Sequence, residues 1–441
     1  MIIFLMVVFL FCMYWLFWMS NTRRIEKFTA SLPMPPSLPV IGHAALFLGN
    51  TEKILKNLED IASIALKNNG AVKLWLGPKL YIAIGNPEDA QLILENCLDK
   101  DVVYRFLRPW LGQGLFIAPL RLWKMHRKIL LPVFHNKVIE EYIGVISKQA
   151  DVLTERLEEQ SGKETFDVLS YISACTLDIV FETSMGEKMD VQHWPDTPYL
   201  RARHTVMEIL NKRLFKVWLQ PDCLFKLTRY AKEQKKNIDL THKFTDEVVQ
   251  KRRLQFEAKE AIGINNTKDS GIIIFEEQQL IFGKEKRALN KEDLIQMQYL
   301  ERVIKESMRL YTVVPIIARN IDRDIYLPYS KVTIPSGVGA VVGAFAIHRS
   351  VDLWGSNANE FDPDRFLPER SKNRHPCSFI PFSHGSRNCI GRNFGMIIIK
   401  GIISNVIRSF RIQADEVGPL KIEMLLFPIR GHQIKITKRM N

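Results

Sequence analysis

The sequence lacks several features that would assign a function at once. Its six cysteines contain no CxxC pair and no regular spacing, which favours free thiols in a reducing compartment over a disulfide framework or a zinc site. Its lysines and arginines are spread along the chain rather than gathered in blocks, so the net charge of +13 indicates an acidic partner or an anionic membrane surface rather than nucleic acid. Internal repeats and low-complexity tracts are also absent. The 441 residues, 46% of them hydrophobic, are enough for two or three domains or for one large α-rich enzyme domain.

The N-terminal segment predicts a membrane anchor. Residues 2–19 contain no charge, which is about the minimum length for a membrane-spanning helix, and Arg23, Arg24 and Lys27 follow. No basic residue precedes this run and no small-residue cleavage pattern follows it, so a cleaved signal peptide is disfavoured. The positive-inside rule then places the rest of the chain in the cytosol.

These observations predict three parts. An anchor covers residues 1–20, a basic flank and proline-rich linker covers 21–43, and a globular domain covers 44–441. Four prolines within the linker make it stiff and extended.

Apolar periodicity in the globular domain is mostly helical, with short strand-like pieces. Residues 71–85 are typical of a hairpin, and residues 331–345 of strand separated by turn. Helices are expected at residues 87–95, 122–157, 168–185, 199–214, 241–260 and 291–310.

Cys389 lies in the stretch PFSHGSRNCIGRNFG, residues 381–395. The residues after Gly391 have helical spacing, so the cysteine is predicted just before a helix N-terminus, where amide groups and the helix dipole favour an anionic sulfur. Gly385 permits a tight turn, and Gly391 permits close approach of a flat group to the backbone. The residues alone are compatible with a nucleophile, a redox thiol or a metal ligand.

The spacing Phe382-x-x-Gly385-x-Arg387-x-Cys389-x-Gly391 resembles the haem-binding loop of the cytochrome P-450 superfamily, the haem-thiolate monooxygenases. The resemblance implies a mainly α fold with small β-sheets (α+β) and a haem b whose iron takes the Cys389 thiolate as its axial ligand. Phe382 is then expected beside the sulfur. Arg387 is expected to pair with a haem propionate.

Two further patterns agree with this resemblance. Glu306 and Arg309 in KESMRL face each other on a helix, and Arg365 in FDPDRF matches the family arginine that joins them in a buried network. In WKMHR, Trp123 and Arg127 share one helical face, where an indole N–H and a guanidinium suit the two oxygens of a propionate. The first set is expected to brace the cysteine loop and the second to bind the cofactor.

The segments YRFLRPWLGQGL, QYLERVIKESMRLY and RHPCSFIPFS resemble the fourth branch of the superfamily, especially its insect members. That branch implies lipophilic substrates such as fatty acids, isoprenoids or foreign compounds, and electrons from a flavin-containing NADPH reductase. It also implies location in the endoplasmic reticulum membrane with a cytosolic catalytic domain. Candidate substrate-lining regions are residues 104–114, 314–317 and 425–428.

The chain departs from the family in one internal segment. The family has a long helix across the distal face of the haem, with an acid-threonine pair that manages proton delivery to dioxygen. Here the interval at residues 261–274 holds no such pair and is too short for that helix at about 1.5 Å per residue. The pair Glu182–Thr183 aligns with a different helix. We therefore expect an internal deletion near residues 261–275 and assign no catalytic side chain.

Three functions stay open at this point. The chain is a reductase-driven monooxygenase by descent, with the activity of the shortened form in doubt. Alternatively, it is a peroxide-rearranging haem-thiolate enzyme, which needs neither the reductase nor the acid-threonine pair. A third alternative is a catalytically impaired haem-binding isoform or decoy that competes for the reductase.

Overall fold

The computed structural model describes residues 2–39, 41–194, 197–255, 272–283, 287–414 and 416–439, except for some side chains within these ranges. Two compact units make up the chain, and each is described by itself. The first unit consists of Met1–Arg105, Arg309–Glu360 and Asn373–Asn388. The second consists of Phe106–Met308, Phe361–Lys372 and Cys389–Asn441.

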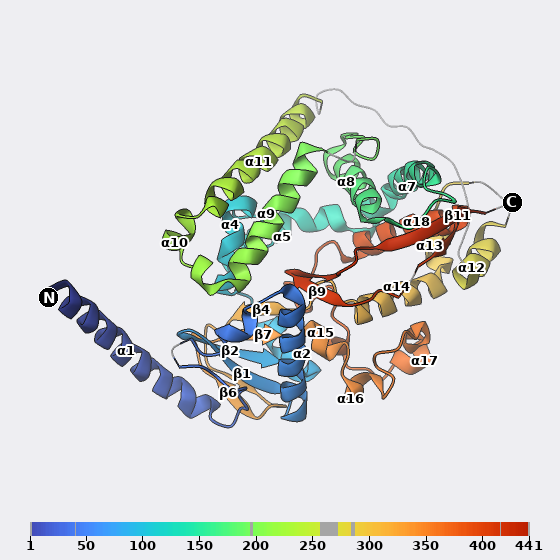
Figure 1. Cartoon of the computed structure of the whole chain (residues 1–441). Helices are drawn as coiled ribbons and strands as arrows, with labels where there is room; N and C mark the ends of the chain where they lie inside the picture. The colour runs from blue at the N-terminus through green and yellow to red at the C-terminus, as the bar shows by residue number, and fades with distance from the viewer. Residues whose placement is uncertain are drawn as a thin grey trace. The chain divides into compact units, whose positions relative to one another are not determined.

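A four-stranded sheet in the order β1-β2-β7-β4 forms the centre of the first unit (Figure 1). The β1–β2 hairpin closes at Gly77, whose φ of +59° suits the first position of a two-residue loop. β2 then pairs in parallel with β7, which pairs antiparallel with β4. The strands are β1 (Ala71–Leu76), β2 (Lys79–Ile84), β4 (Ile317–Asn320), β7 (Gly339–Val342) and the separate pair β5 (Ile325–Leu327) and β6 (Val332–Ile334); the helices are α1 (Ile2–Thr29), α2 (Thr51–Lys67), α3 (Pro87–Asn96), α15 (Ala344–Ile347) and α16 (Val351–Trp354).

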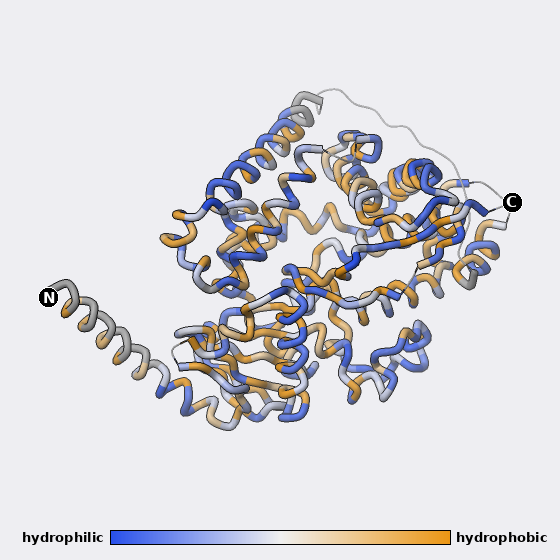
Figure 2. Tube along the Cα trace, viewed as in Figure 1, coloured by the Kyte–Doolittle hydropathy of each residue, from blue (hydrophilic) through white to orange (hydrophobic). Residues whose placement is uncertain are grey.

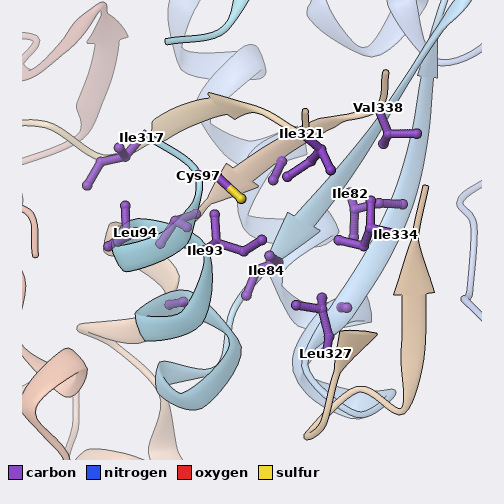
Figure 3. Packing of buried hydrophobic residues seen from close by; sticks show 14 of the residues in the cluster. Ile82, Ile84, Ile93, Leu94, Cys97, Ile317, Ile321, Leu327, Ile334 and Val338 are labelled. Atoms are coloured by element: carbon purple, nitrogen blue, oxygen red, sulfur yellow. The ribbon is translucent and has the colours of Figure 1, made fainter. Parts of the chain in front are cut away.

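The core of the first unit is where α3 meets the sheet. α3 begins with Asn86, whose side chain accepts a hydrogen bond from the Asp89 amide, and with a proline at the first helical position. Figure 3 shows Ile93 and Cys97 from the end of this helix gathered with β-sheet residues such as Ile84. All three are at most 2% exposed, so this packing fixes the C-terminal end of α3 and the residues that follow it.

The second unit is mainly helical. α7 packs along α18, and α9 packs along α11 (Figure 1). Hydrophobic and hydrophilic residues are mixed along α11 (Figure 2). Its helices are α4 (Arg108–Leu111), α5 (Leu120–Leu130), α6 (Asn136–Glu141), α7 (Ile143–Glu158), α8 (Leu169–Met185), α9 (Pro198–Phe215), α10 (Asp222–Lys226), α11 (Arg229–Gln255), α12 (Ile272–Phe282), α13 (Lys291–Gln296), α17 (Pro368–Ser371) and α18 (Arg392–Ser409); its strands are β3 (Phe166–Asp167), β8 (Phe410–Gln413), β9 (Leu420–Glu423), β10 (Leu425–Pro428) and β11 (Gln433–Lys438). One further helix, α14 (Gln298–Leu310), begins in the second unit and ends in the first.

The N-terminal segment forms the helix α1, but many side chains of the predicted anchor at residues 1–20 lie outside the described part of the chain. Among the residues that are described, no helix is both long and apolar enough to cross a membrane.

Most predicted elements are present, and the differences have local causes. The hairpin at residues 71–85 is confirmed, as are the helices that correspond to α3, α8 and α9. The continuous helix expected at residues 122–157 is wrong, because a 3₁₀ turn at Leu131–Phe134 contains Pro132 and divides it. The helix predicted from residue 241 starts earlier, at Arg229, and the one predicted at 291–310 is broken after α13. The predicted deletion near residues 261–275 falls largely outside the described residues.

Close packing between α18 and α7 depends on Gly401. A Cβ atom built there would lie 2.7 Å from Ile146 Cγ2 and 3.3 Å from a methyl carbon of Leu289. We therefore expect Gly401→Ala to destabilise the protein, since overpacking costs about 1–3 kcal/mol and a glycine-to-alanine change in a helix gains about 1 kcal/mol at most. The matched control is Gly395→Ala in the same helix, where a Cβ would meet nothing within 4 Å. Urea unfolding should rank Gly395→Ala above Gly401→Ala, and equal midpoints would contradict the packing argument.

Candidate functional site

The loop before Cys389 is a series of tight turns in the first unit. The Ile380 carbonyl accepts a hydrogen bond from the Ser383 amide at 3.0 Å, and the Gly385 carbonyl accepts one from the Asn388 amide at 3.1 Å. Ser383 and Gly385 have φ angles of +64° and +73°. Left-handed backbone is costly for serine and easy for glycine, so this loop needs support from its surroundings.

The end of α3 and the residues after it supply part of this support. Arg387 Nη1 donates to the Leu98 carbonyl at 2.5 Å, and His384 Nε2 lies 2.9 Å from a carboxylate oxygen of Glu95. A Cβ on Gly385 would lie 2.7 Å from the Leu94 carbonyl oxygen, so the backbone of the loop lies directly against the helix end. The predicted tight turn at Gly385 is therefore also a close approach.

Cys389 opens the last stretch of the second unit. Its side chain is exposed, and α18 begins three residues later with Gly391 as the N-terminal cap residue. The predicted position just before a helix N-terminus is thus confirmed. Gly391 has a φ of −90°, and a Cβ there would be 3.6 Å from a ring carbon of Phe134, which is an ordinary contact, so the described residues leave room for a side chain at this position.

Trp123 and Arg127 come together on α5 as their spacing predicted. The Arg127 guanidinium lies 5.7 Å from the centre of the indole ring, and Trp123 is buried. Burial lowers the pKa of Arg127, and the Cys389 thiol acts in the opposite direction. The same electrostatic coupling shows that Cys389 and this arginine are near each other.

The first unit holds a cluster of three cations, the buried Arg387 and Arg319 and the partly exposed Lys100. Arg319 on β4 is fully buried, and its Nε atom has no hydrogen-bond partner among the described residues. Burial, and then the charges of Arg319 and Arg387, lower the pKa of Lys100 to about 7. Burial, and then Arg319, lower the pKa of Arg387 to about 10, against the influence of Asp99 and Tyr104. Like charges held together away from water are costly, so an anion is the group that this cluster fits.

Glu306 and Arg365 form a buried ion pair in the second unit. Arg365 Nε lies 3.3 Å from Glu306 Oε1 without a well-aligned hydrogen bond from that nitrogen, and the Asp362 amide donates to the same oxygen at 2.9 Å. Both side chains are at most 7% exposed. The pair therefore joins α14 to the segment that contains FDPDRF.

Arg309, one turn further along α14, lies in the first unit and is fully buried. Its Nη1 donates to the carbonyls of His348 and Ala358 at 2.8 and 2.6 Å, and its Nη2 donates to that of Glu360 at 3.1 Å. Its guanidinium also lies 4.9 Å from the centre of the Trp354 ring. The position of this arginine determines the path of residues 348–360.

Comparison with known proteins decides the family. A sequence model of cytochrome P450 matches residues 32–271 and 272–436. Human cytochrome P450 4V2 is 30% identical over 487 residues, covering 95% of this chain and 92% of the relative, and cytochrome P450 4c3 of Drosophila melanogaster is 29% identical over 492 residues, covering 95% and 91%. The chain is a cytochrome P450.

The fold agrees with this membership. The structure of the haem domain of cytochrome P450DA superposes with a TM-score of 0.76 over 93% of this chain and 98% of that one, at 18% identity. The resemblance to the fourth, insect-like branch is confirmed by the fourth-family relatives. As a cytochrome P450, the chain is a monooxygenase by family and a haem protein whose iron is held by a cysteine thiolate.

The residues present fit a haem in this P450. Haem carries two carboxylates, and the partly unsatisfied guanidinium of Arg319 and its buried neighbours are suited to such groups. Sequence reasoning missed Arg319 and Lys100. A signal for Arg319 existed, because a single arginine within an apolar strand-like run is expected to have a partner when buried.

The candidate substrate-lining regions are only partly available for that role. Phe106 is buried with its ring 4.6 Å from the Arg213 guanidinium, which also lies 4.0 Å from the ring of Phe225. Phe106 therefore packs within the protein, whereas Val314 is 41% exposed.

Replacement of Gly385 by alanine is expected to disturb the cysteine loop of this P450. A matched control is Gly337→Ala, where φ is +89° but a Cβ would meet nothing within 4 Å. Both changes place alanine in a left-handed conformation, at about 1–2 kcal/mol. Gly385→Ala should cost about 1–3 kcal/mol more, because the Leu94 carbonyl blocks the new methyl group. Thermal unfolding of the two variants measures this difference, and an equal loss in both would contradict it.

Proposed function

We propose that the chain is a membrane-anchored haem-thiolate monooxygenase in which Cys389 is the axial ligand. It hydroxylates lipophilic substrates such as fatty acids, isoprenoids or foreign compounds, with electrons from a flavin-containing NADPH reductase. The observation that carries the proposal is the position of Cys389. It is an exposed thiol that follows a loop of tight turns, precedes α18 and lies near Arg127.

Each side chain at the site has a distinct part in this function. Bound haem supplies the oxidative chemistry, and the protein supplies the thiolate and holds the cofactor. Arg127 with Trp123, and Arg387 with Arg319, are suited to the haem carboxylates. Phe382 packs beside the sulfur, as the resemblance implies.

The anchor proposal has its own support. The eighteen uncharged residues at 2–19 form part of α1, and five of the apolar side chains described there are more than half exposed: Leu5, Met6, Phe9, Met13 and Leu16. An apolar segment followed by basic residues is typical of an anchor whose following domain is cytosolic. Placement in the endoplasmic reticulum membrane follows from this orientation and the family resemblance.

The internal deletion is supported by the comparisons. The alignment with human cytochrome P450 4V2 spans 487 positions, more than the 441 residues of this chain, so some positions of the relative have no counterpart here. The family match divides between residues 271 and 272, inside the interval predicted to be shortened. On this basis we propose that the distal helix with its acid-threonine pair is missing.

A second candidate function, an impaired haem-binding isoform, is favoured by the surface of α5 and the turn after it. Met125, Ile129, Leu131 and Val133 are between 45% and 66% exposed. Several exposed apolar side chains close together on one short segment are unusual for the solvent-facing surface of a soluble domain. Glu182 and Thr183 do not replace the missing pair, because Glu182 accepts from Gln149 at 2.6 Å and Thr183 donates to the Ile179 carbonyl at 2.7 Å.

Replacing the ligand tests the central assignment. Cys389→Ala should abolish the thiolate-type spectrum of the reduced, carbon-monoxide-bound protein, because no sulfur then follows the loop. Cys223→Ala, at another exposed cysteine, is the control and should leave the spectrum unchanged. A thiolate-type spectrum that survives in Cys389→Ala would show that another residue is the ligand.

Turnover assays separate the three functions. We expect the purified chain to oxidise dodecanoic acid only with NADPH and a flavin reductase. Turnover of a fatty-acid hydroperoxide without NADPH would favour the rearranging enzyme. Reductase binding and a thiolate-type spectrum without any turnover would favour the impaired isoform.

A further inference from the structure

His348 is a fully buried histidine that links the end of α14 to the start of the cysteine loop. Its Nδ1 lies 2.8 Å from the hydroxyl oxygen of Thr312, and the Ile380 amide donates to its Nε2 at 2.8 Å. All three residues belong to the first unit and are at most 2% exposed.

These contacts determine the tautomer of the ring. A backbone amide can only donate, so Nε2 of His348 must be unprotonated and Nδ1 carries the hydrogen. Nδ1–H then donates to Thr312, whose hydroxyl donates in turn to the Arg309 carbonyl at 2.9 Å. Burial, followed by the charges of Arg309 and Arg349, lowers the pKa of His348 to about 3, so the ring is neutral at physiological pH.

Two further contacts restrain the backbone and the ring of His348. Arg309 Nη1 donates to the backbone carbonyl of His348 itself, and the ring lies 5.3 Å from the ring of Phe379. The ring therefore has little freedom to move away from the amide that it accepts.

That amide belongs to the first residue of the strained turn. Ile380 donates through its N–H to His348 and accepts through its carbonyl from Ser383, which has a left-handed backbone. Non-glycine residues keep such a conformation only where the surroundings hold it. His348 is the side chain that holds the entry to this turn.

We propose that His348 is a positioning residue. It fixes the start of the cysteine loop and thereby the position of the Cys389 sulfur that follows the loop. The consequence for the sulfur rests on the proposed function of Cys389, while the hold on the loop does not. Nothing in this role requires contact with haem or substrate.

Two amide replacements separate the roles of the two nitrogens of His348. In His348→Gln the amide group reaches the position of Nε2 and can still accept from Ile380. In His348→Asn the amide group reaches only the position of Nδ1, so the bond to Thr312 can be kept but the acceptor for Ile380 is lost. Each variant loses one buried hydrogen bond, but only His348→Asn takes the acceptor away from the buried Ile380 amide, because in His348→Gln the Thr312 hydroxyl still donates to the Arg309 carbonyl.

The first measurement is hydrogen–deuterium exchange of peptides that cover residues 379–388 in the full-length protein. Exchange of the Ile380 and Ser383 amides should rise by about tenfold in His348→Asn and much less in His348→Gln, because a buried hydrogen bond of this strength is worth about that factor. Equal exchange in both variants, or exchange unchanged from the parent protein in His348→Asn, would overturn the proposal.

The second measurement is the thiolate-type spectrum of the carbon-monoxide complex. His348→Asn should lose about fivefold or more of the thiolate-type band, since the cost of an unpaired buried amide favours a displaced loop. His348→Gln should keep most of the band, and a parent-like band in His348→Asn would overturn the effect on the sulfur. If the parent protein itself shows no thiolate-type band but the exchange difference is present, the proposed function fails and the role of His348 in the loop stands.

Discussion

The hydrogen bonds of the buried Arg309 guanidinium are the interactions on which residues 348–360 of this P450 depend. Three backbone carbonyls from residues 348–360 converge on one buried side chain, so replacing Arg309 would remove the donors of three carbonyls at once. Because one of those carbonyls belongs to His348, the same arginine also sets the position of the imidazole. The conformation of the cysteine loop thus depends, through His348, on Arg309, which lies far from the loop in the sequence.

Buried charge is used in two opposite ways in this chain. Glu306 and Arg365 satisfy each other in the second unit, so their burial costs little beyond desolvation. Arg319, Arg387 and Lys100 in the first unit are instead a set of like charges. Burial lowers all three pKa values, and neighbouring cations of the set lower those of Arg387 and Lys100 further. The charges of the first arrangement compensate each other, while the second is suited to an anionic group such as the carboxylates of haem.

Within the first unit, the cysteine loop and the α14 arginine both have definite partners. The loop is bonded to Leu98 and His348, and Arg309 is bonded to three backbone carbonyls. The alignment with human cytochrome P450 4V2 contains positions that have no counterpart in this chain. Family membership establishes the cofactor and the type of chemistry, whereas the activity of a particular chain is a property of its own site residues.

The sequence by itself determined the elements that carry strong local signals. The hairpin at residues 71–85, the helix with Asn86 and Pro87 at its start and the helix after Gly391 all follow from turn residues, caps and periodicity over short stretches. The positions of Trp123 and Arg127 on one face of α5 were likewise predictable, because four residues make about one helical turn.

Only the tertiary structure decided which distant groups meet. Lys100 and Arg319 come from segments more than two hundred positions apart, and their shared burial depends on pairing of strands that no local pattern specifies. His348 looks like any histidine beside an arginine until Thr312 and Ile380 are placed at its two nitrogens. The early start of α11 also depends on what that stretch packs against, since periodicity reports a buried face but not its partner.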